Sequence, residues 1–448
     1  MNFSKRNFAV LFLFGIIGQI AWTVENMYFN LFVFETISPD LDAITLMVQA
    51  SGIAATLVTL IAGTLSDKIG NRRSLISIGY IIWGITVVLF GFISTETVEA
   101  LFGVDADTAI RICLATVIIG DCVMTLFGST ANDAAFSAWV TDNTDNSNRG
   151  RIESILAIFP LISMLIVAGG FGIIKDAVGY TVMFLILGLA ISASGVAGLF
   201  MIKDSEKLER GGTLKDMITG FKPSTVLANK PFYIALLITC VYGIACQIFM
   251  PYLIIFMTQY LGFSVIEYSV VFALAILLGA AVNIFLGKLS DKINKANAMY
   301  IATMIFSLGL LLMYFTSFMK KPLLTFTFGI AGFVMICGYI FISALSGAIV
   351  RDETPKEDTG KLQGVRMIFF VLIPMLLGPA IGNAINAARG IKLPDESSAD
   401  TMTTHFIPAP EIFLVGAIVA LLIFALIPVL SKMTSSKVES KKEQNDII

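Results

Sequence analysis

Long apolar segments alternate with short polar ones along the whole chain. Stretches of about 20 mainly apolar residues, the length that crosses a bilayer as a helix, begin near twelve positions: Phe8, Thr45, Ser74, Ile112, Ile152, Thr181, Phe232, Tyr268, Ala298, Leu323, Gly364 and Ile412. A polar, basic interval at 203–230 separates the first six from the last six. The pattern predicts an all-α integral membrane protein with six-helix bundles at 1–202 and 231–432, a cytoplasmic linker at 203–230 and a cytoplasmic tail at 433–448.

Composition supports a membrane protein and excludes most other classes. Hydrophobic residues make up 56% of the 448 residues and charged residues only 14%, which is too apolar for soluble domains. The five cysteines fall inside apolar stretches without CxxC spacing, and His405 is the only histidine. We therefore expect no metal site, no cofactor and no catalytic centre. The net charge of −2 and the lack of a basic patch give no reason to expect a nucleic-acid partner.

The distribution of Lys and Arg predicts the orientation in the membrane, since basic loops stay in the cytoplasm. With the N-terminus inside, all but six of the 30 basic residues fall on the cytoplasmic side. The six outside are Arg111, Lys175, Lys320, Lys321, Arg389 and Lys392. We expect a multi-pass plasma-membrane protein with both termini in the cytoplasm, and a monomer.

Two motifs occur once in each half of the chain, which indicates an internal duplication. GTLSDKIGNRR at Gly63–Arg73 corresponds to GKLSDKIN at Gly287–Asn294. SAWVTDNTDNSNRGRIES at Ser137–Ser154 resembles SGAIVRDETPKEDTGKLQG at Ser346–Gly364, and this alignment matches Asp142 with Asp352. Duplicated bundles are typical of secondary transporters.

These motifs and the six-plus-six topology resemble the major facilitator superfamily. Membership implies transport by alternating access, with helices 1, 4, 7 and 10 lining a central cavity. The helix 1 run GQIAWTVENMYFN and the helix 4 ending NDAAFSAWVTDNTDNSNRGR more weakly resemble the glycoside-pentoside-hexuronide:cation symporters and the related sucrose carriers. Of the acids that sodium-coupled members use, only Asp133 has a counterpart, while Gln19 stands at the helix 1 position. The resemblance therefore favours a proton over sodium as the coupling ion.

Three carboxylates lie inside predicted spans: Glu25, Asp121 and Asp133. An ionisable residue within a span costs about 2.5 to 3.5 kcal/mol on insertion scales, which makes it a functional candidate. At a rise of about 1.5 Å per residue, Glu25 and Asp121 lie at a common depth about 15 Å from the outer end. We expect both to face one space and share a proton. The alternative for Glu25 and Asp121 is a structural contact with a neighbouring Asn or Ser. For Asp133 we expect a role in binding the substrate or the coupling cation, or else a loop contact with Arg149 and Arg151.

Helix 1 also carries a polar stripe, Gln19, Asn26 and Asn30, beside aromatic residues that include Trp22 and Tyr28. Amides bind hydroxyl groups and aromatic faces stack on sugar rings, so this surface suits a neutral, hydroxyl-rich cargo. Ordinary helix packing is the alternative. We add three further candidate cargo-binding residues on helices 4, 7 and 10: Asn132, Gln247 and Tyr339.

The duplicated loops suggest a cytoplasmic gate. Asp67 is placed to pair with Arg72 and Arg73 and to meet the start of helix 11 near Arg366. The second copy has Asp291 but no paired arginines, so we expect a weaker contact there. A loop that only fixes topology is the alternative.

Together these features predict a secondary active transporter that moves a small molecule through the lipid bilayer, by proton-coupled symport of a sugar or glycoside. Two alternatives stay open. One is an exporter of drugs or amphipathic metabolites that works by proton antiport, which aromatic and Met-rich cavities would suit. The other is a sensor that binds ligand without transporting it.

Overall fold

The computed structural model describes residues 4–69, 71–144, 148–204, 220–290, 293–354, 359–393 and 405–433. Within these ranges the side chains at 64–69, 149–150, 153–154, 288–290, 359–361 and 363 lie outside the description. The predicted gate residues Asp67 and Asp291 therefore fall outside what the structure describes at the side-chain level, as does most of the predicted linker and tail.

Eleven helical segments of the described chain are long and apolar enough to cross a membrane. Ten contain one predicted span each, and Ile155–Met201 contains two. The two spans join without a loop because the turn between them is made at Gly179, whose φ of 79° and ψ of 170° are not helical. Only glycine adopts such a φ readily, so the polypeptide changes direction there at little energetic cost.

The helices group into two compact units, each of which is described separately. Unit 1 comprises the described residues within Met1–Gly211, Met250–Ala273 and Pro379–Ala409, and unit 2 the remainder. Unit 1 thus includes short stretches from the second half of the sequence, around predicted helices 7, 8 and 11.

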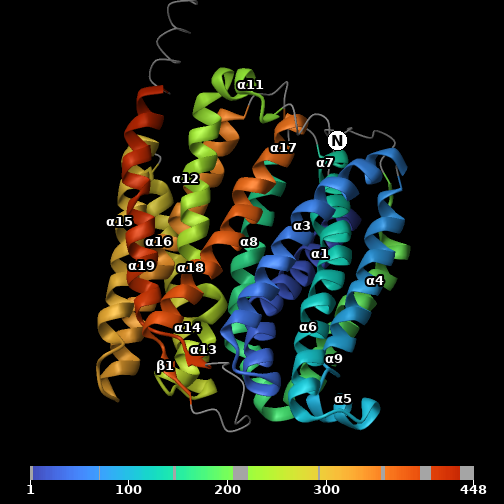
Figure 1. Cartoon of the computed structure of the whole chain (residues 1–448). Helices are drawn as coiled ribbons and strands as arrows, with labels where there is room; N and C mark the ends of the chain where they lie inside the picture. Colours follow the sequence, from blue (N-terminus) through green and yellow to red (C-terminus); the bar gives the residue numbers. More distant parts are fainter. Residues whose placement is uncertain are drawn as a thin grey trace, which may run out of the picture. The chain divides into compact units, whose positions relative to one another are not determined.

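Unit 1 is built from these elements: α1 (Lys5–Val24), η1 (Glu25–Phe29), α2 (Asn30–Phe32), η2 (Val33–Ile37), α3 (Leu41–Ile69), α4 (Arg72–Phe90), α5 (Thr95–Phe102), α6 (Ala106–Gly128), η3 (Ser129–Phe136), α7 (Ser137–Asp142), α8 (Arg149–Ile166), η4 (Val167–Phe171), α9 (Gly172–Met201), η5 (Met250–Tyr252), α13 (Leu253–Ile255), η6 (Phe256–Tyr260), the start of α14 (Val265–Ser290), the end of α18 (Ile373–Arg389), β1 (Ile391–Lys392) and β2 (Phe406–Ile407). The two strands pair antiparallel. The main helix contacts are α4 with α9, α3 with α6 and α1 with α8 (Figure 1).

Unit 2 contains the rest of α14 and the start of α18, together with α11 (Pro223–Ala228), α12 (Lys230–Gln247), α15 (Lys295–Thr316), α16 (Leu323–Glu353), α17 (Thr359–Met367), η7 (Ile368–Leu372) and α19 (Glu411–Leu421). Helix α15 packs against both α16 and α19. Helix α11 is a single short helix without buried residues, in the segment where a linker is predicted.

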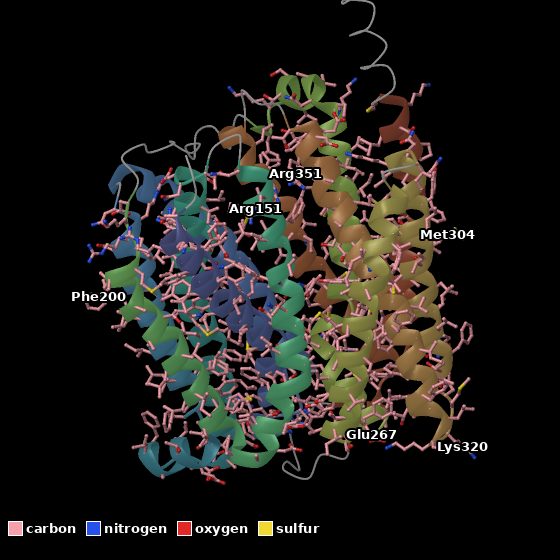
Figure 2. The ribbon with its side chains drawn as sticks, turned by 180° about the vertical axis from the view of Figure 1, so that it is seen from behind. Arg151, Phe200, Glu267, Met304, Lys320 and Arg351 are labelled. Atoms are coloured by element: carbon pink, nitrogen blue, oxygen red, sulfur yellow. The ribbon has the colours of Figure 1, made fainter. Side chains whose placement is uncertain are left out.

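Apolar side chains cover the outside of each unit as well as its interior. Phe200 on α9 is 80% exposed, and Met304 on α15 is 59% exposed. Figure 2 shows each of them projecting outward from its own bundle. Large exposed apolar residues are normally unfavourable in water, so these surfaces are suited to lipid.

Several spans are interrupted by π-helical turns, among them η1 at Glu25, η3 at Ser129, η4 at Val167 and η7 at Ile368. A π turn inserts an extra residue, changes the direction of the following side chains, and occurs frequently at functional sites. Glu25 begins η1, and Asp133 lies within η3. Two of the three predicted functional carboxylates therefore lie at irregular turns.

Candidate functional site

The first candidate site lies among three helices of unit 1. Glu25 stands at the junction of α1 and η1, Ser51 on α3, and Asp121 and Thr125 on α6. We call these four residues the carboxylate cluster. All are buried, with 8% of Glu25 and 2% of Asp121 exposed. Glu25 and Asp121 are neighbours in this cluster, because the Ser51 hydroxyl is a hydrogen-bond partner of both.

Three side-chain oxygens of this cluster form a closed triangle. The Ser51 hydroxyl lies 3.1 Å from Glu25 Oε1, the Thr125 hydroxyl lies 3.2 Å from the same oxygen, and the two hydroxyls are 2.8 Å apart. A complete set of three hydrogen bonds needs three protons. The two hydroxyls supply two, and a protonated Glu25 would supply the third.

Two further carboxylate oxygens of the cluster are buried without a partner. Among the described residues, neither Glu25 Oε2 nor Asp121 Oδ1 has a hydrogen-bond partner. An ionised carboxylate without partners is strongly disfavoured in a medium of low polarity, and two adjacent ones more so. The geometry is therefore suited to a pair of acids that holds at least one proton between them.

A second polar cluster lies along η3 and centres on Asp133. Ser129 donates to Asp133 Oδ2 at 3.0 Å, and the Asn132 side-chain amide donates to Asp133 Oδ1 at 3.1 Å. The indole of Trp22 on α1 also lies against this carboxyl. Unlike the buried pair, Asp133 is partly exposed. Both of its oxygens accept hydrogen bonds from neutral donors.

The position of Asn132 is itself fixed by a further hydrogen bond. The hydroxyl of Tyr80, on α4, lies 2.8 Å from Asn132 Oδ1 and 2.9 Å from the backbone oxygen of Phe14. Because the Asn132 oxygen faces Tyr80, its amide nitrogen is directed at Asp133. Gly18 makes room for this arrangement, since a Cβ there would lie 2.5 Å from Asn132 Oδ1.

Aromatic rings pack beside the Asp133 cluster. The rings of Trp22 and Trp83 are 5.0 Å apart at their centroids, with an interplanar angle of 45°. Gly128 lies against both, because a Cβ at this position would be within 3.0 Å of each indole. Trp22 is partly exposed whereas Trp83 is fully buried, so Trp22 presents the accessible aromatic surface.

The polar stripe of helix 1 is divided between exposed and buried positions. Asn26 is exposed and its amide donates to the backbone oxygen of Trp22, while Gln19 is partly exposed. Asn30 is buried and donates to the backbone oxygen of Asn26. Tyr28 is fully buried, and its hydroxyl lies 3.5 Å from that of Tyr268. A role in cargo binding stays a prediction for all four.

Gln247 and Tyr339, the two second-half candidates, belong to unit 2. Tyr242 donates to the backbone oxygen of Tyr339 at 3.1 Å, and the two rings are 5.8 Å apart. Gln247 packs closely against Gly378 of α18. Both candidates are partly exposed, and their role in binding also stays a prediction.

The basic gate residues have the following described contacts, and the predicted pairing with Asp67 lies outside the described side chains. Arg72 pairs with Asp142, whose carboxylate Oδ2 is 3.1 Å from Arg72 Nε. The Arg73 guanidinium donates to the backbone oxygen of Leu199, and its backbone N–H donates to Asp204. Arg366, in unit 2, is exposed and lies 4.9 Å from the centre of the Phe370 ring. These contacts do not test a gating function.

Sequence reasoning did not select several residues that complete the two clusters. Ser51 and Thr125 are hydroxyl residues in the middle of apolar spans, and Tyr80 is the only tyrosine of α4. A polar residue inside a span is itself a signal, but it does not reveal which carboxylate it faces. Within the described residues, no group of three His, Cys, Asp or Glu side chains is placed to hold a metal ion.

Comparison with known proteins gives the family. The sequence model of the Major Facilitator Superfamily matches residues 11–379. The chain belongs to this superfamily. The predicted fold class, an all-α membrane protein of the major facilitator type, is confirmed, and so is the general class of transporter.

Individual members of the superfamily are similar to different extents. An uncharacterized MFS-type transporter, YkuC of Bacillus subtilis (strain 168), is 30% identical over 100 residues, which cover 22% of this chain and 23% of that protein. The crystal structure of the nucleoside transporter NupG has a TM-score of 0.65 at 14% identity, covering 96% of this chain and 100% of that one. A bacterial homologue of the human lysosomal transporter Spinster, inward-facing and unoccupied, has a TM-score of 0.67 at 14% identity, covering 96% and 98%. At these identities, the solved structures show the fold alone.

Proposed function

We propose that this superfamily member is a secondary active transporter that moves a sugar or glycoside together with a proton. The observation that carries the proposal is the triangle of Glu25, Ser51 and Thr125 oxygens, which needs one proton more than the hydroxyls supply. Asp121 adds a second acid beside it. A site that binds and releases one proton is what coupling to a proton gradient requires.

Neutral surroundings favour a proton over sodium in this site. Among the described side chains, Ser51 and Thr125 are the hydrogen-bond partners of Glu25, and no described ion pair includes Glu25 or Asp121. Glu25 Oε2 and Asp121 Oδ1 have no hydrogen-bond partner among the described residues, so either can take up a proton directly. Protonation needs no further ligand, which supports the proton as the coupling ion.

The cargo class is proposed from the residues beside this site. Gln19 and Asn26 present amide groups on helix 1, and Trp22 presents a partly exposed ring next to the Asp133 carboxylate. Amides, a carboxylate and an aromatic face are the groups that bind hydroxyls and stack on sugar rings. The structural likeness to a nucleoside transporter is compatible with this class, because a nucleoside also carries a sugar ring.

The test is a pH measurement outside lightly buffered proteoliposomes that contain the purified protein. Monosaccharides, disaccharides, aryl glycosides and nucleosides are added in turn, first without sodium and then with it. We expect at least one glycoside to make the outside more alkaline without sodium. If no compound of the panel changes the outside pH in either condition, the proposal is contradicted. Extrusion of a lipophilic cation in the absence of any sugar would favour the exporter. Binding without any flux would instead indicate a sensor.

A further inference from the structure

The charge of Asp133 is not balanced by any side chain that the structure describes around it. Its contacts come from Ser129, Asn132 and Trp22, all of them neutral. The described ion pairs are those of Arg72, Lys175 and Lys295 and do not include Asp133. A carboxylate in a membrane helix without a cationic partner is energetically costly, so something outside the described side chains is expected to compensate it.

The two carboxylate sites of unit 1 differ in the way their charge can be compensated. Glu25 and Asp121 are buried side by side, with oxygens that have no partner, so a proton serves them best. Both Asp133 oxygens already accept hydrogen bonds. Because Asp133 is also partly exposed, a cationic group of the cargo can supply its counter-charge without displacing these donors.

Asp133 is also accessible and rigidly held, unlike an incidental surface carboxylate. It is partly exposed, and so are Trp22 and Gln19. Since a carboxylate is strongly disfavoured against lipid, its exposed part is expected to face a water-filled space. The chain of hydrogen bonds from Tyr80 through Asn132 fixes its orientation before any ligand arrives, as preorganised binding sites require.

The ring of Trp22 supplies the second element of a cation site. The indole N–H of Trp22 is a hydrogen-bond donor to the Asp133 carboxyl, and the ring packs against Trp83 and Gly128. Indole faces attract ammonium groups, with an energy that increases when water is excluded. A fixed anion beside a partly exposed indole is therefore suited to a protonated amine that is attached to a larger cargo.

From this geometry we infer that Asp133 and Trp22 form a subsite for a protonated amino group of the cargo, so that the preferred cargo is an amino sugar or an amine-bearing glycoside. This inference rests on the proposed function and narrows its substrate class. It also separates the roles of the acids: Glu25 and Asp121 hold the transported proton, and Asp133 binds the cargo.

The test compares two pairs of probes, and the members of each pair differ in having an ammonium group or a hydroxyl group at one position. 2-Aminoethyl β-glucoside carries an ammonium where 2-hydroxyethyl β-glucoside carries a hydroxyl, and glucosamine and glucose form a second pair. Isothermal titration calorimetry on the purified full-length protein measures the binding constant for each. We expect the ammonium probe of at least one pair to bind about tenfold or more tightly, which corresponds to about 1.4 kcal/mol.

Two variants assign the preference to Asp133. Asp133→Asn keeps the shape of the side chain but removes its charge, and should reduce the ratio of the two binding constants to about one. Glu96→Gln makes the same change of charge at an exposed position on α5 and should leave the ratio unaltered. If Asp133→Asn does not yield folded protein, the ratio of binding constants in the wild-type protein tests the amine subsite. Trp22→Phe is then the second variant and should lower this ratio by weakening the cation–π contact.

The outcomes separate this inference from the proposed function. The amine subsite would be overturned if the wild-type protein binds the ammonium and hydroxyl probes equally, or if Asp133→Asn keeps the wild-type ratio of binding constants. Neither result would contradict sugar transport. Failure of all four sugars and glycosides to bind or move, while other compounds are transported, would contradict the proposed function and the inference with it.

Discussion

Arg72 Nε lies 3.1 Å from Asp142 Oδ2, and both side chains are almost completely enclosed, with 0% and 1% of their surface exposed. The second half of the chain has an ion pair between Lys295, the first residue of α15 as Arg72 is of α4, and Asp352, but there about half of each side chain is exposed. The duplicated motifs thus produce a similar contact twice. Only the first copy is buried.

This difference predicts unequal effects on stability. Arg72→Ala removes a cationic partner of the buried Asp142 carboxylate and should lower the free energy of unfolding by about 3 to 5 kcal/mol. Lys295→Ala breaks an exposed pair and should lower it by about 1 kcal/mol at most. Denaturant unfolding of the purified variants in the same detergent measures both values. Equal losses would show that burial of the Arg72 pair is not what matters.

A hydroxyl contact joins segments from the two halves of the sequence within unit 1. The Tyr252 hydroxyl lies 2.6 Å from the Thr45 hydroxyl and 3.0 Å from the backbone oxygen of Pro379. Tyr252→Phe removes both hydrogen bonds and should lower the free energy of unfolding by about 1 to 3 kcal/mol, at about 0.5 to 1.5 kcal/mol each. Tyr314→Phe, at a tyrosine described only through ring contacts, is the control and should have little effect.

If Tyr252 also holds one transport state closed, Tyr252→Phe should increase the rate of cargo exchange, because the contact must break when the segments separate. Counterflow in proteoliposomes measures this rate. An unchanged rate together with lower stability would limit Tyr252 to a structural role.

Close packing of α15 on α16 depends on two glycines. A Cβ at Gly309 would lie 2.3 Å from the Met335 backbone, and one at Gly338 would lie 2.3 Å from the backbone nitrogen of Phe306. Because backbone atoms cannot rotate away, Gly309→Ala and Gly338→Ala should each lower the free energy of unfolding by about 1 to 3 kcal/mol. Gly332→Ala on α16 meets no atom within 4 Å and should be neutral. A loss of similar size at Gly332 would contradict the packing explanation.

The proximity of Glu25 and Asp121 predicts that their substitutions are not independent. If the two acids share one proton, Glu25→Gln and Asp121→Asn should each reduce proton-driven uptake strongly, and the double variant should be little worse than either single one. Initial rates of uptake under an imposed pH gradient provide the measurement. Effects that multiply would mean two separate sites.

Much of the architecture is predictable from the sequence because apolar length is a direct signal for a membrane helix. The twelve apolar stretches and the duplicated motifs are sufficient to predict the superfamily and its fold. The structure joins two of those stretches into one helical segment at Gly179. A glycine in an apolar run is compatible with either a helix or a turn, and so its φ of 79° was not predictable.

The candidate site was only partly predictable. A charge within an apolar span stands out, which is how Glu25, Asp121 and Asp133 were selected. Their partners depend on helix rotation, which π turns such as η1 and η3 alter. The pairing of Arg72 with Asp142 likewise depends on the approach of two helix ends that are 70 residues apart in sequence.

The most direct test of proton coupling measures uphill cargo accumulation and counterflow in proteoliposomes, for wild-type protein and for Glu25→Gln reconstituted in equal amounts. Counterflow measures cargo exchange without net proton movement. Accumulation under an inward proton gradient needs cargo movement and net proton movement together. We predict that Glu25→Gln keeps counterflow and loses accumulation, because glutamine preserves the contacts with Ser51 and Thr125 but cannot release a proton. Full accumulation by Glu25→Gln would contradict the account.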